Sequence, residues 1–339
     1  MYNNILVFMP SWIGDTVMAL PAVDRLREAY PHSRIDALAR SWVAKLLEAY
    51  KTLDKVWFYE AQGRYRTLLG MAASIRNGGY DLAVLMPNSF RAALLSFLGG
   101  IPVRAGYRSD GRGLLLTHSL ARNEGACSLH MVEYYLEILR AIGLEPVASA
   151  PRLAINDEQR LQAARIFEQK RVDTSRPLVG LLPGAQNSDA KMWLSSRFAR
   201  VADLIVQHFG ASVVFFGGSG DLNRVEEVRR QMHEPSFTLV GQTPLEILAA
   251  AIERCRVFVS NDTGPMHVAA AVGTPVVAIF SSTDPRITAP YSGPCSIIQA
   301  NVPCAPCGKR KCDRNFECMK AISVDDVLRA VAYQITVTH

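Results

Sequence analysis

Apolar runs and helix-period segments alternate along the first half of the chain. The apolar runs are short and rich in β-favouring residues, whereas the segments between them repeat apolar positions every three to four residues. The predicted strands are Ile5 to Phe8, Ile35 to Leu38, Val56 to Tyr59 and Leu82 to Met86, and the predicted helices are Asp15 to Ala29, Trp42 to Tyr50, Arg66 to Arg76 and Arg91 to Leu98. This alternation predicts a parallel sheet with right-handed crossovers and helices on both faces.

The same pattern restarts in the second half. A helix around Val132 to Ile142 is followed by Gly143-Leu144-Glu145-Pro146 and a Pro/Ala/Ser stretch to Pro151, which indicates an interdomain linker. The later predicted strands are Leu178 to Leu182, Val213 to Phe216, Phe237 to Val240, Val257 to Val259 and Val276 to Phe280, with helices near 195–208, 222–232, 244–254 and 265–272.

We therefore expect an α/β protein with two doubly wound, Rossmann-like domains. They would comprise residues 1–150 and 151–322, and a final helix within 323–339 could pack back across either domain. Open α/β sheets bind ligands at the carboxyl ends of their strands, so two such domains are expected to face each other across a ligand-binding cleft.

The amino-acid composition limits the classes of molecule that the protein is expected to bind. No stretch approaches the ~20 consecutive apolar residues of a membrane helix, and no basic signal-peptide head precedes the first strand, so a cytoplasmic protein is expected. A net charge of +6 and a pI of about 9.0 predict an acidic partner. Because the basic residues are scattered, small phosphorylated ligands or an anionic membrane surface are favoured over nucleic acid.

The segment Ser260 to Ala271 carries the strongest local signal of a ligand site. A polar turn there leaves an apolar strand and enters a helix directly. Free backbone N–H groups and the helix dipole converge at such a turn, and His267 on the first helical turn can add a donor. A phosphate-bearing ligand is the predicted occupant.

Asp15 follows the first strand and is the candidate general base. Asp-Thr at a helix start also suits a plain N-cap, and on the local sequence alone the cap is favoured. The dinucleotide fingerprint Gly-x-Gly-x-x-Gly is absent from this turn.

Three further loops in the second half each have a functional and a structural interpretation. Lys191, with the Gly184 and Ala185 amides, would suit a diphosphate, although on the local sequence alone a solvated lysine beside a Trp193 hydrophobic staple is favoured. Asp221 follows a glycine turn and would suit ribose hydroxyls, or else caps the next helix. Thr243 before Pro244 reads as a helix cap or as a contact to a base.

Four of the seven cysteines lie in one short segment with the spacing C-x2-C-x4-C-x5-C. Cys304, Cys307, Cys312 and Cys318 could bind zinc, remain reduced, or form a disulfide on isolation, and the last two gaps fit no standard zinc ribbon. Cys127, Cys255 and Cys295 are expected to be isolated, buried thiols.

In combination, four motifs resemble one family, the ADP-heptose:lipopolysaccharide heptosyltransferases. They are Ser-Trp-Ile-Gly-Asp at 11–15, Met-Pro-Asn-Ser-Phe-Arg at 86–91, Leu-Pro-Gly-Ala-x5-Lys-x-Trp at 182–193 and Asn-Asp-Thr-Gly-x-Met-His at 261–267. The resemblance runs from Ile5 to about Ile335. The Pro-Asn-Ser-Phe element and Gly-Ile-Pro-x-Arg-x-Gly at 100–106 look most like the heptosyltransferase II branch.

The resemblance implies a GT-B fold and an inverting transfer that uses no metal or other cofactor. The amino-terminal domain would hold a lipid-linked inner-core lipopolysaccharide acceptor, with Asp15 as base and peripheral contact with the inner membrane, and the carboxyl-terminal domain would hold ADP-heptose. Lys191 would bind the diphosphate and act in catalysis. The other expected donor-binding residues are Gly184, Ala185, Ser188, Asp221, Thr243, Asp262, Thr263, Gly264 and His267, although 186–190 departs from the hydroxyl-bearing residues of some relatives.

The residues themselves are compatible with this chemistry. The sequence has no Asp-x-Asp pair to hold a divalent cation on a diphosphate, so Lys191 and the helix amino end at 262–267 would have to stabilise the leaving group. The arginines expected to pair with acceptor phosphates and carboxylates are Arg64, Arg66, Arg91, Arg104, Arg108 and Arg112. Heptosyltransferase I or III, a nucleotide-sugar epimerase and a non-catalytic nucleotide-sugar binding protein remain alternatives.

Overall fold

The structure is a computed structural model that describes residues 2–59, 65–186, 188–291 and 293–337. The chain divides into two compact units, Met1–Ala154 and Ile155–His339. The division falls just beyond the Pro/Ala/Ser stretch that ends at Pro151.

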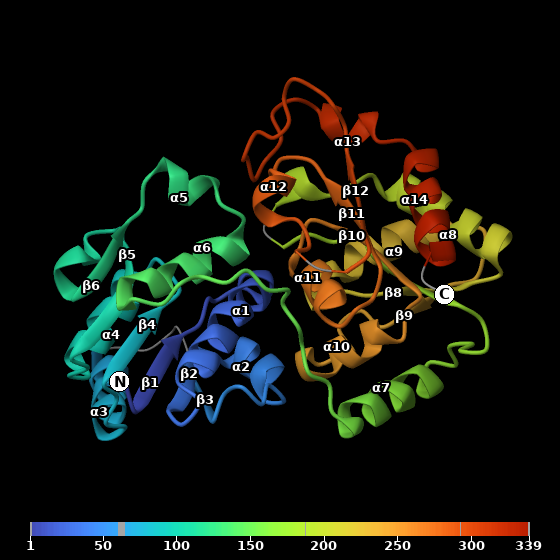
Figure 1. Ribbon diagram of the computed structural model, residues 1–339. Helices are drawn as coiled ribbons and strands as arrows, with labels where there is room; N and C mark the ends of the chain where they lie inside the picture. Colours follow the sequence, from blue (N-terminus) through green and yellow to red (C-terminus); the bar gives the residue numbers. More distant parts are fainter. Residues whose placement is uncertain (1, 60–64, 187, 292, 338–339) are drawn as a thin grey trace. The chain divides into compact units, whose positions relative to one another are not determined.

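The first unit is built on a parallel sheet covered by helices on both faces (Figure 1). Its described residues form six strands in the order β3-β2-β1-β4-β5-β6, and the order reverses between β1 and β4. The strands are β1 (Asn4–Phe8), β2 (Arg34–Arg40), β3 (Lys55–Tyr59), β4 (Leu82–Leu85), β5 (Val103–Arg108) and β6 (His118–Ala121). The helices are α1 (Ile13–Ala29), α2 (Ser41–Leu47), α3 (Tyr65–Asn77), α4 (Phe90–Leu98), α5 (Glu124–Ser128) and α6 (Met131–Glu137), with 3₁₀ turns η1 (Arg112–Leu115) and η2 (Ile138–Ile142).

The second unit repeats this topology. Its described strands lie in the order β12-β11-β10-β7-β8-β9, all parallel, with the reversal between β7 and β10. The strands are β7 (Leu178–Leu182), β8 (Ser212–Phe215), β9 (Phe237–Thr238), β10 (Val257–Asn261), β11 (Val276–Phe280) and β12 (Cys295–Gln299). The helices are α7 (Asp157–Gln169), α8 (Ser195–Phe209), α9 (Leu222–Arg230), α10 (Leu245–Glu253), α11 (Gly264–Ala271), α12 (Pro285–Thr288), α13 (Glu317–Ala321) and α14 (Val324–Val337), with 3₁₀ turns η3 (Asp189–Lys191) and η4 (Ser219–Asp221).

The predicted fold class, α/β with two doubly wound parallel sheets, is confirmed. The central strands β7, β10 and β11 are buried along their whole length, because helices cover both faces of the sheet. Strands β5, β6 and β12 were missed by the sequence pattern. They lie at or next to a sheet edge, β6 and β12 are only partly buried, and their sequences lack a continuous apolar run.

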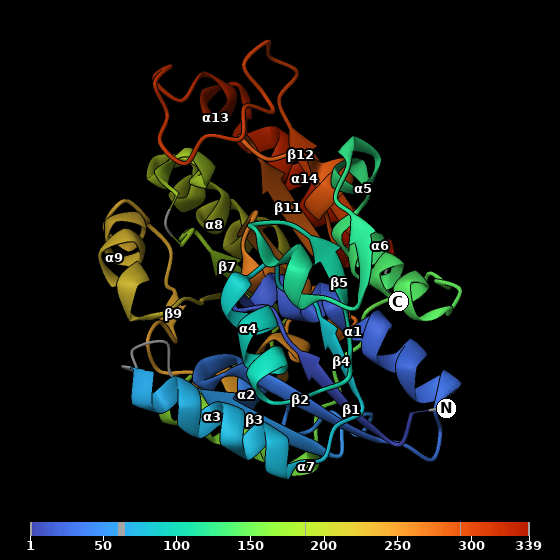
Figure 2. The ribbon, with the colours of Figure 1, turned by 90° about the vertical axis from the view of Figure 1, so that its left-hand side faces the viewer.

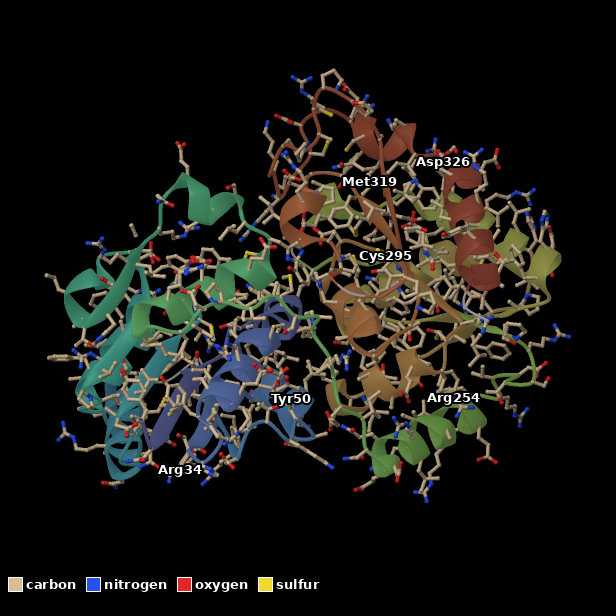
Figure 3. All side chains as sticks on the ribbon, viewed as in Figure 1. Arg34, Tyr50, Arg254, Cys295, Met319 and Asp326 are labelled. Atoms are coloured by element: carbon tan, nitrogen blue, oxygen red, sulfur yellow. The ribbon has the colours of Figure 1, made fainter. Side chains whose placement is uncertain are left out.

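The last two helices complete the core of the second unit. Met319 of α13 is fully buried, and α14 packs on α8 and on strands β10, β11 and β12 (Figure 3 labels Met319 and Asp326 on these helices). Within the described residues, no helix is long and apolar enough to cross a membrane.

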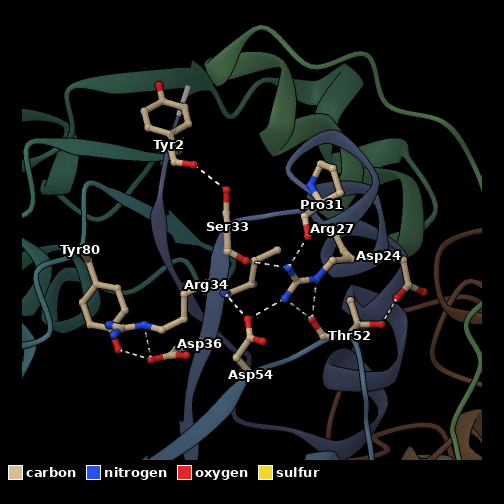
Figure 4. A network of polar contacts seen from close by, with 11 residues as sticks. Tyr2, Asp24, Arg27, Pro31, Ser33, Arg34, Asp36, Thr52, Asp54 and Tyr80 are labelled. Carbon is tan, nitrogen blue, oxygen red and sulfur yellow. Dashed lines mark hydrogen bonds and ion pairs between the residues drawn. The ribbon is translucent and has the colours of Figure 1, made fainter.

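A polar network fixes the amino edge of the first sheet (Figure 4). The carboxylate of Asp36, which is 1% exposed, accepts hydrogen bonds from the Tyr80 hydroxyl at 2.5 Å and the Trp57 indole at 3.2 Å. Nearby, Arg27 pairs with Asp54 at 2.6 Å and donates to the Ser33 carbonyl at 2.6 Å. Arg27 is paired with Asp54, and Asp36 has two hydrogen-bond donors on Oδ2, although its buried Oδ1 finds no partner among the described residues. Charges paired in this way suit a structural edge.

Candidate active site

The loop between β7 and α8 is fastened by side chains from the ends of neighbouring strands. The fully buried Asn261, at the end of β10, donates to the carbonyls of Pro183 at 2.9 Å and Gly184 at 3.3 Å. Its carbonyl oxygen accepts the Trp193 backbone N–H at 3.0 Å. Ser281, just beyond β11, donates to the Ala190 carbonyl at 2.7 Å. Both ends and the middle of this loop are therefore held at the carboxyl edge of the sheet.

Trp193 itself is buried in the core and forms the predicted hydrophobic staple. It lies at the N′ position of α8 and contacts Phe198 one turn into the helix, with ring centroids 5.2 Å apart in an edge-to-face arrangement. The staple sets the direction in which the chain enters α8, and so helps to place the loop before it.

Lys191 is held by an acidic partner. Its Nζ lies 2.6 Å from Oδ2 of Asp262, and the Thr283 hydroxyl donates to the same oxygen at 2.5 Å. The Asp262 side chain is 4% exposed and that of Lys191 is 26% exposed. The buried, negatively charged Asp262 is therefore better suited to position the ammonium group of Lys191 than to contact a phosphate itself.

The predicted strand-to-helix turn after β10 is present. Thr263 is the N-cap residue of α11 in an extended conformation, and its side chain makes no capping hydrogen bond. Gly264 opens the helix, Pro265 has no N–H, and His267 is 5% exposed on the first turn. The amino end of α11 thus offers backbone N–H groups and the positive end of the helix dipole, as an anion site requires.

Asp221 lies against the Gly184 backbone. Its carboxylate accepts the Gly218 N–H at 2.9 Å, and a Cβ built on Gly184 would lie 2.0 Å from Oδ1 of Asp221. Burial raises the pKa of this carboxyl, against the opposing effect of the Gly218 N–H. The simple cap interpretation was wrong for α9, because Asp221 makes no side-chain capping bond there. The side chain instead joins the turns that follow β7 and β8.

The structure changes the interpretation of two other predicted donor contacts. Thr243 was expected to cap a helix, but α10 begins at Leu245 with Pro244 as its N-cap residue, so the cap prediction was wrong. The Ser188 hydroxyl donates to the Arg310 carbonyl at 3.1 Å, and the Ala190 N–H donates to the same oxygen at 3.3 Å. Ala185 is half-buried beside Gly184, whereas Asn187 lies outside the described residues.

The cysteine-rich segment contacts the loop that carries Lys191 through the Arg310 carbonyl, which accepts from Ser188 and Ala190. Besides the Arg310 contacts, the Gly308 N–H donates to the Ser282 carbonyl at 2.7 Å. In both views this segment lies beside α13 (Figures 1 and 2).

All seven cysteines are free thiols. Across the described part of the chain, no three His, Cys, Asp or Glu side chains are grouped so that they could hold a metal ion, so the structure does not support the zinc alternative. Burial raises the pKa of the Cys318 thiol, and the neighbouring Cys304, Cys312 and Cys307 add to that rise. Cys255 is buried as predicted, but the prediction was wrong for Cys127, which is exposed.

In the first unit, Asp15 lies on the first turn of α1. Trp12 occupies the N-cap position and makes no side-chain capping bond, so the prediction that Asp15 is the cap was wrong. Asp15 instead accepts a hydrogen bond from the Tyr135 hydroxyl of α6. Burial, followed by the charge of Asp15, raises the pKa of Tyr135 well above its usual value, so this hydroxyl remains a donor.

The turn after β4 is locked in place by Arg112. This side chain is fully buried, and its guanidinium donates to the Tyr107 carbonyl at 2.8 Å, to the Pro87 carbonyl and to Oδ1 of Asn88 at 3.1 Å. The Asn88 amide donates in turn to the Tyr134 hydroxyl at 2.6 Å. Sequence reasoning did not anticipate Tyr134 or Tyr135, because their spacing on α6 matches ordinary core packing.

The described members of the predicted arginine group differ in their surroundings. Arg112 supports the loop described above, and Arg104 donates to the Leu115 carbonyl at 2.6 Å, whereas Arg108 is exposed. Arg91 lies on the first turn of α4, with its guanidinium 6.0 Å from the centre of the Tyr59 ring. Arg64 and the side chain of Arg66 lie outside the described residues.

Comparison with known proteins identifies a consistent set of relatives. Residues 69–316 match the model of glycosyltransferase family 9 (heptosyltransferase). The chain is 33% identical to lipooligosaccharide heptosyltransferase 2 of Haemophilus ducreyi, over 87% of this chain and 88% of that protein. It is 30% identical to lipopolysaccharide heptosyltransferase 2 of Escherichia coli K12 over the same shares. The solved structure of E. coli ADP-heptose lps heptosyltransferase II matches with a TM-score of 0.85 and 28% identity, covering 98% of both chains.

The contact between Gly184 and Asp221 predicts that Gly184→Ala will disturb the second unit. The added methyl group must turn the Asp221 carboxylate away from the Gly218 N–H, at a cost of about 1–3 kcal/mol for overpacking. We expect a lower melting temperature, measured by thermal denaturation. Gly220→Ala, in the turn after β8 that carries Asp221, is the control, since a Cβ there meets nothing within 4 Å. Wild-type stability in Gly184→Ala would contradict the prediction.

Proposed function

The chain belongs to glycosyltransferase family 9, and we propose that it transfers L-glycero-D-manno-heptose from ADP-heptose to the first heptose of the lipopolysaccharide inner core. The relatives are heptosyltransferases that act on lipopolysaccharide, and the similar E. coli structure is named for ADP-heptose as well. The observation that carries the proposal is the positioned Lys191 ammonium group at a helix amino end in the second unit, together with a hydrogen-bonded Asp15 in the first.

The second unit would hold the donor. Lys191 and the amino end of α11 would stabilise the two phosphates, while Asp262 and Thr283 hold Lys191 in place. The Gly184 and Ala185 amides would line the diphosphate pocket, Asp221 would contact the ribose and Thr243 the base, and Ser188 would complete the donor-binding loop. As the bond between the anomeric carbon and the diphosphate oxygen breaks, negative charge grows on ADP. These fixed positive groups lower the energy of that state without having to reorganise.

The first unit would hold the acceptor, with Asp15 as general base. Its carboxylate takes the proton of the acceptor hydroxyl while that oxygen forms a bond to the anomeric carbon, on the face opposite the departing ADP. The result is inversion at that carbon. Tyr135 donates to Asp15 and so holds the carboxylate in one orientation.

We propose that this reaction needs no metal. The sequence lacks an Asp-x-Asp pair, and the carboxylate of Asp262, just before the amino end of α11, is already bound by Lys191 and Thr283. Contact with the inner face of the cytoplasmic membrane would be peripheral, because the acceptor is anchored in lipid.

Analysis of the reaction products tests the proposed activity and shows which heptose is added. Purified protein is incubated with ADP-heptose and either a mono-heptosylated or an unheptosylated acceptor, and the products are analysed by mass spectrometry. Addition of one heptose to the mono-heptosylated acceptor alone is the expected result. Transfer to the unheptosylated acceptor would assign the first step instead, and conversion of ADP-heptose without any acceptor would indicate an epimerase.

Asp15→Ala should abolish transfer and leave ADP-heptose affinity close to that of the wild type. The base belongs to the acceptor side, so its loss raises the barrier without removing a donor contact. Turnover is measured by product formation and donor affinity by calorimetry. Substantial turnover in the variant would remove Asp15 from the role of base.

Tyr135→Phe should move the acid limb of the pH–rate profile to higher pH by about one unit. The lost hydrogen bond favours the ionised carboxylate, so without it Asp15 takes up its proton at a higher pH and activity falls earlier on acidification. Tyr134→Phe, on the same helix but bonded to Asn88 and Arg122, is the control and should leave that limb in place. An unchanged limb in Tyr135→Phe would show that this hydroxyl does not act on the base.

Chelation with EDTA should leave the rate of transfer unchanged. Lys191 and α11 provide the positive charge that a divalent cation would otherwise supply. The rate is compared before and after dialysis against EDTA, and again after magnesium is added. A rate that collapses and is restored by magnesium would refute the metal-free mechanism.

A further inference from the structure

Arg40 lies at the carboxyl end of β2, the neighbour of β1 in the first sheet. Its Nε and Nη1 atoms are shielded from solvent, and neither finds a hydrogen-bond acceptor among the described residues. A buried donor without a partner costs about 1–3 kcal/mol, so native proteins rarely retain one without a reason. A ligand with an anionic oxygen is a physical reason for such a donor at a ligand-binding edge.

Aromatic rings hold this guanidinium in place. Its central carbon lies 4.8 Å from the centre of the Tyr59 ring and 5.6 Å from that of Trp42. Arg91 contacts the same Tyr59 ring at 6.0 Å, so two cations share one aromatic ring at the ends of β2 and β3. Stacking restrains the direction of a guanidinium but satisfies none of its N–H groups.

The surrounding surface suits a saccharide. Trp12, Trp42 and Phe90 are 50%, 45% and 48% exposed, and they stand at or just before the starts of α1, α2 and α4. These helices follow β1, β2 and β4, which are adjacent in the sheet. The Trp42 indole also donates to the Ser11 carbonyl at 3.0 Å, which connects this cluster to the turn that carries Asp15. Flat aromatic faces beside guanidinium groups fit sugar rings that bear negative charges.

Arg34, on the same strand, shows the contrasting arrangement. It also stacks over a tyrosine, with its guanidinium 5.0 Å from the centre of the Tyr80 ring. However, it pairs with Asp36 at 3.4 Å and donates to the Gly78 carbonyl at 2.6 Å. At the amino edge the arginine has acceptors within the protein, whereas at the carboxyl edge Nε and Nη1 of Arg40 have none in the part of the chain that the structure describes.

We propose that Arg40 binds an anionic group of the acceptor saccharide, with Arg91 assisting across the Tyr59 ring. The anion is a phosphate ester or a sugar carboxylate, both of which match the planar fork of a guanidinium. The site selects a charged acceptor and places its hydroxyl near Asp15. This inference rests on the proposed function, since it assigns part of the acceptor-binding surface.

The test compares Arg40→Gln, Arg40→Lys and the control Arg34→Gln with the wild type. In Arg40→Gln, the KM for the acceptor should rise about tenfold to a hundredfold, with the KM for the donor and the kcat within about twofold of the wild type. Arg40→Lys should recover part of the loss, because it restores the charge without the fork. Arg34→Gln should leave the acceptor KM unchanged, and thermal denaturation shows that each variant is folded.

Phosphatase treatment of the acceptor distinguishes the two anions. If phosphate is bound, the wild type should have a higher KM for the treated acceptor than for the untreated one. The wild type and Arg40→Gln should then have similar KM values for the treated acceptor. If a carboxylate is bound, that difference should survive the treatment. An acceptor KM that does not change in Arg40→Gln, or a donor KM that rises equally, would overturn the proposal.

A binding measurement keeps this test separate from the proposed reaction. Inorganic phosphate is titrated into the wild type and into Arg40→Gln, and the fluorescence of the tryptophans, which include Trp42, is followed. Weaker phosphate binding in Arg40→Gln supports an anion site even if no heptose transfer is detected, in which case only the proposed function fails. Equal binding, together with an unchanged acceptor KM, removes the site while the transferase assignment stands.

Discussion

The buried amide and carboxylate of Asn261 and Asp262 are the constraint on which the second unit's site depends. Polar groups this deeply buried must be hydrogen-bonded, and their partners come almost entirely from one loop. Asn261 holds the two ends of that loop, and Asp262 holds Lys191. The central strand β10 is rigid because it pairs with β7 and β11, so the loop inherits its position from the sheet. A ligand then meets a lysine whose position is already fixed.

The ion pair between Lys191 and Asp262 also determines which charge the site exposes. The carboxylate of Asp262 is buried while the ammonium group of Lys191 is partly exposed, so the pair presents its positive end outward. The amino end of α11 adds a positive potential of the same orientation. An isolated buried ion pair seldom adds stability, because desolvation offsets the attraction between the charges. Its retention here is better explained by the placement of charge than by stability.

The sequence alone could predict those parts of the site that are local. The turns after β7, β8 and β10 are visible because polar residues directly follow apolar runs, and parallel strands bring their carboxyl ends to one edge. Contacts between distant segments left no such signal. Tyr135 reaches Asp15 from another helix, and the Arg310 carbonyl reaches Ser188 from the cysteine-rich segment. The edge strands β6 and β12 were missed for a different reason, since half-buried strands carry too few apolar residues.

The charged side chains at the two edges of the first sheet have different kinds of partners. At the amino edge, Arg34 pairs with Oδ2 of Asp36, and that oxygen also accepts from Tyr80 and Trp57. At the carboxyl edge, the neutral Tyr135 hydroxyl donates a hydrogen bond to Asp15. Aromatic rings hold Arg40, and no carboxylate among the described residues pairs with it. These contacts orient both side chains at the carboxyl edge of the sheet, where open α/β sheets bind their ligands.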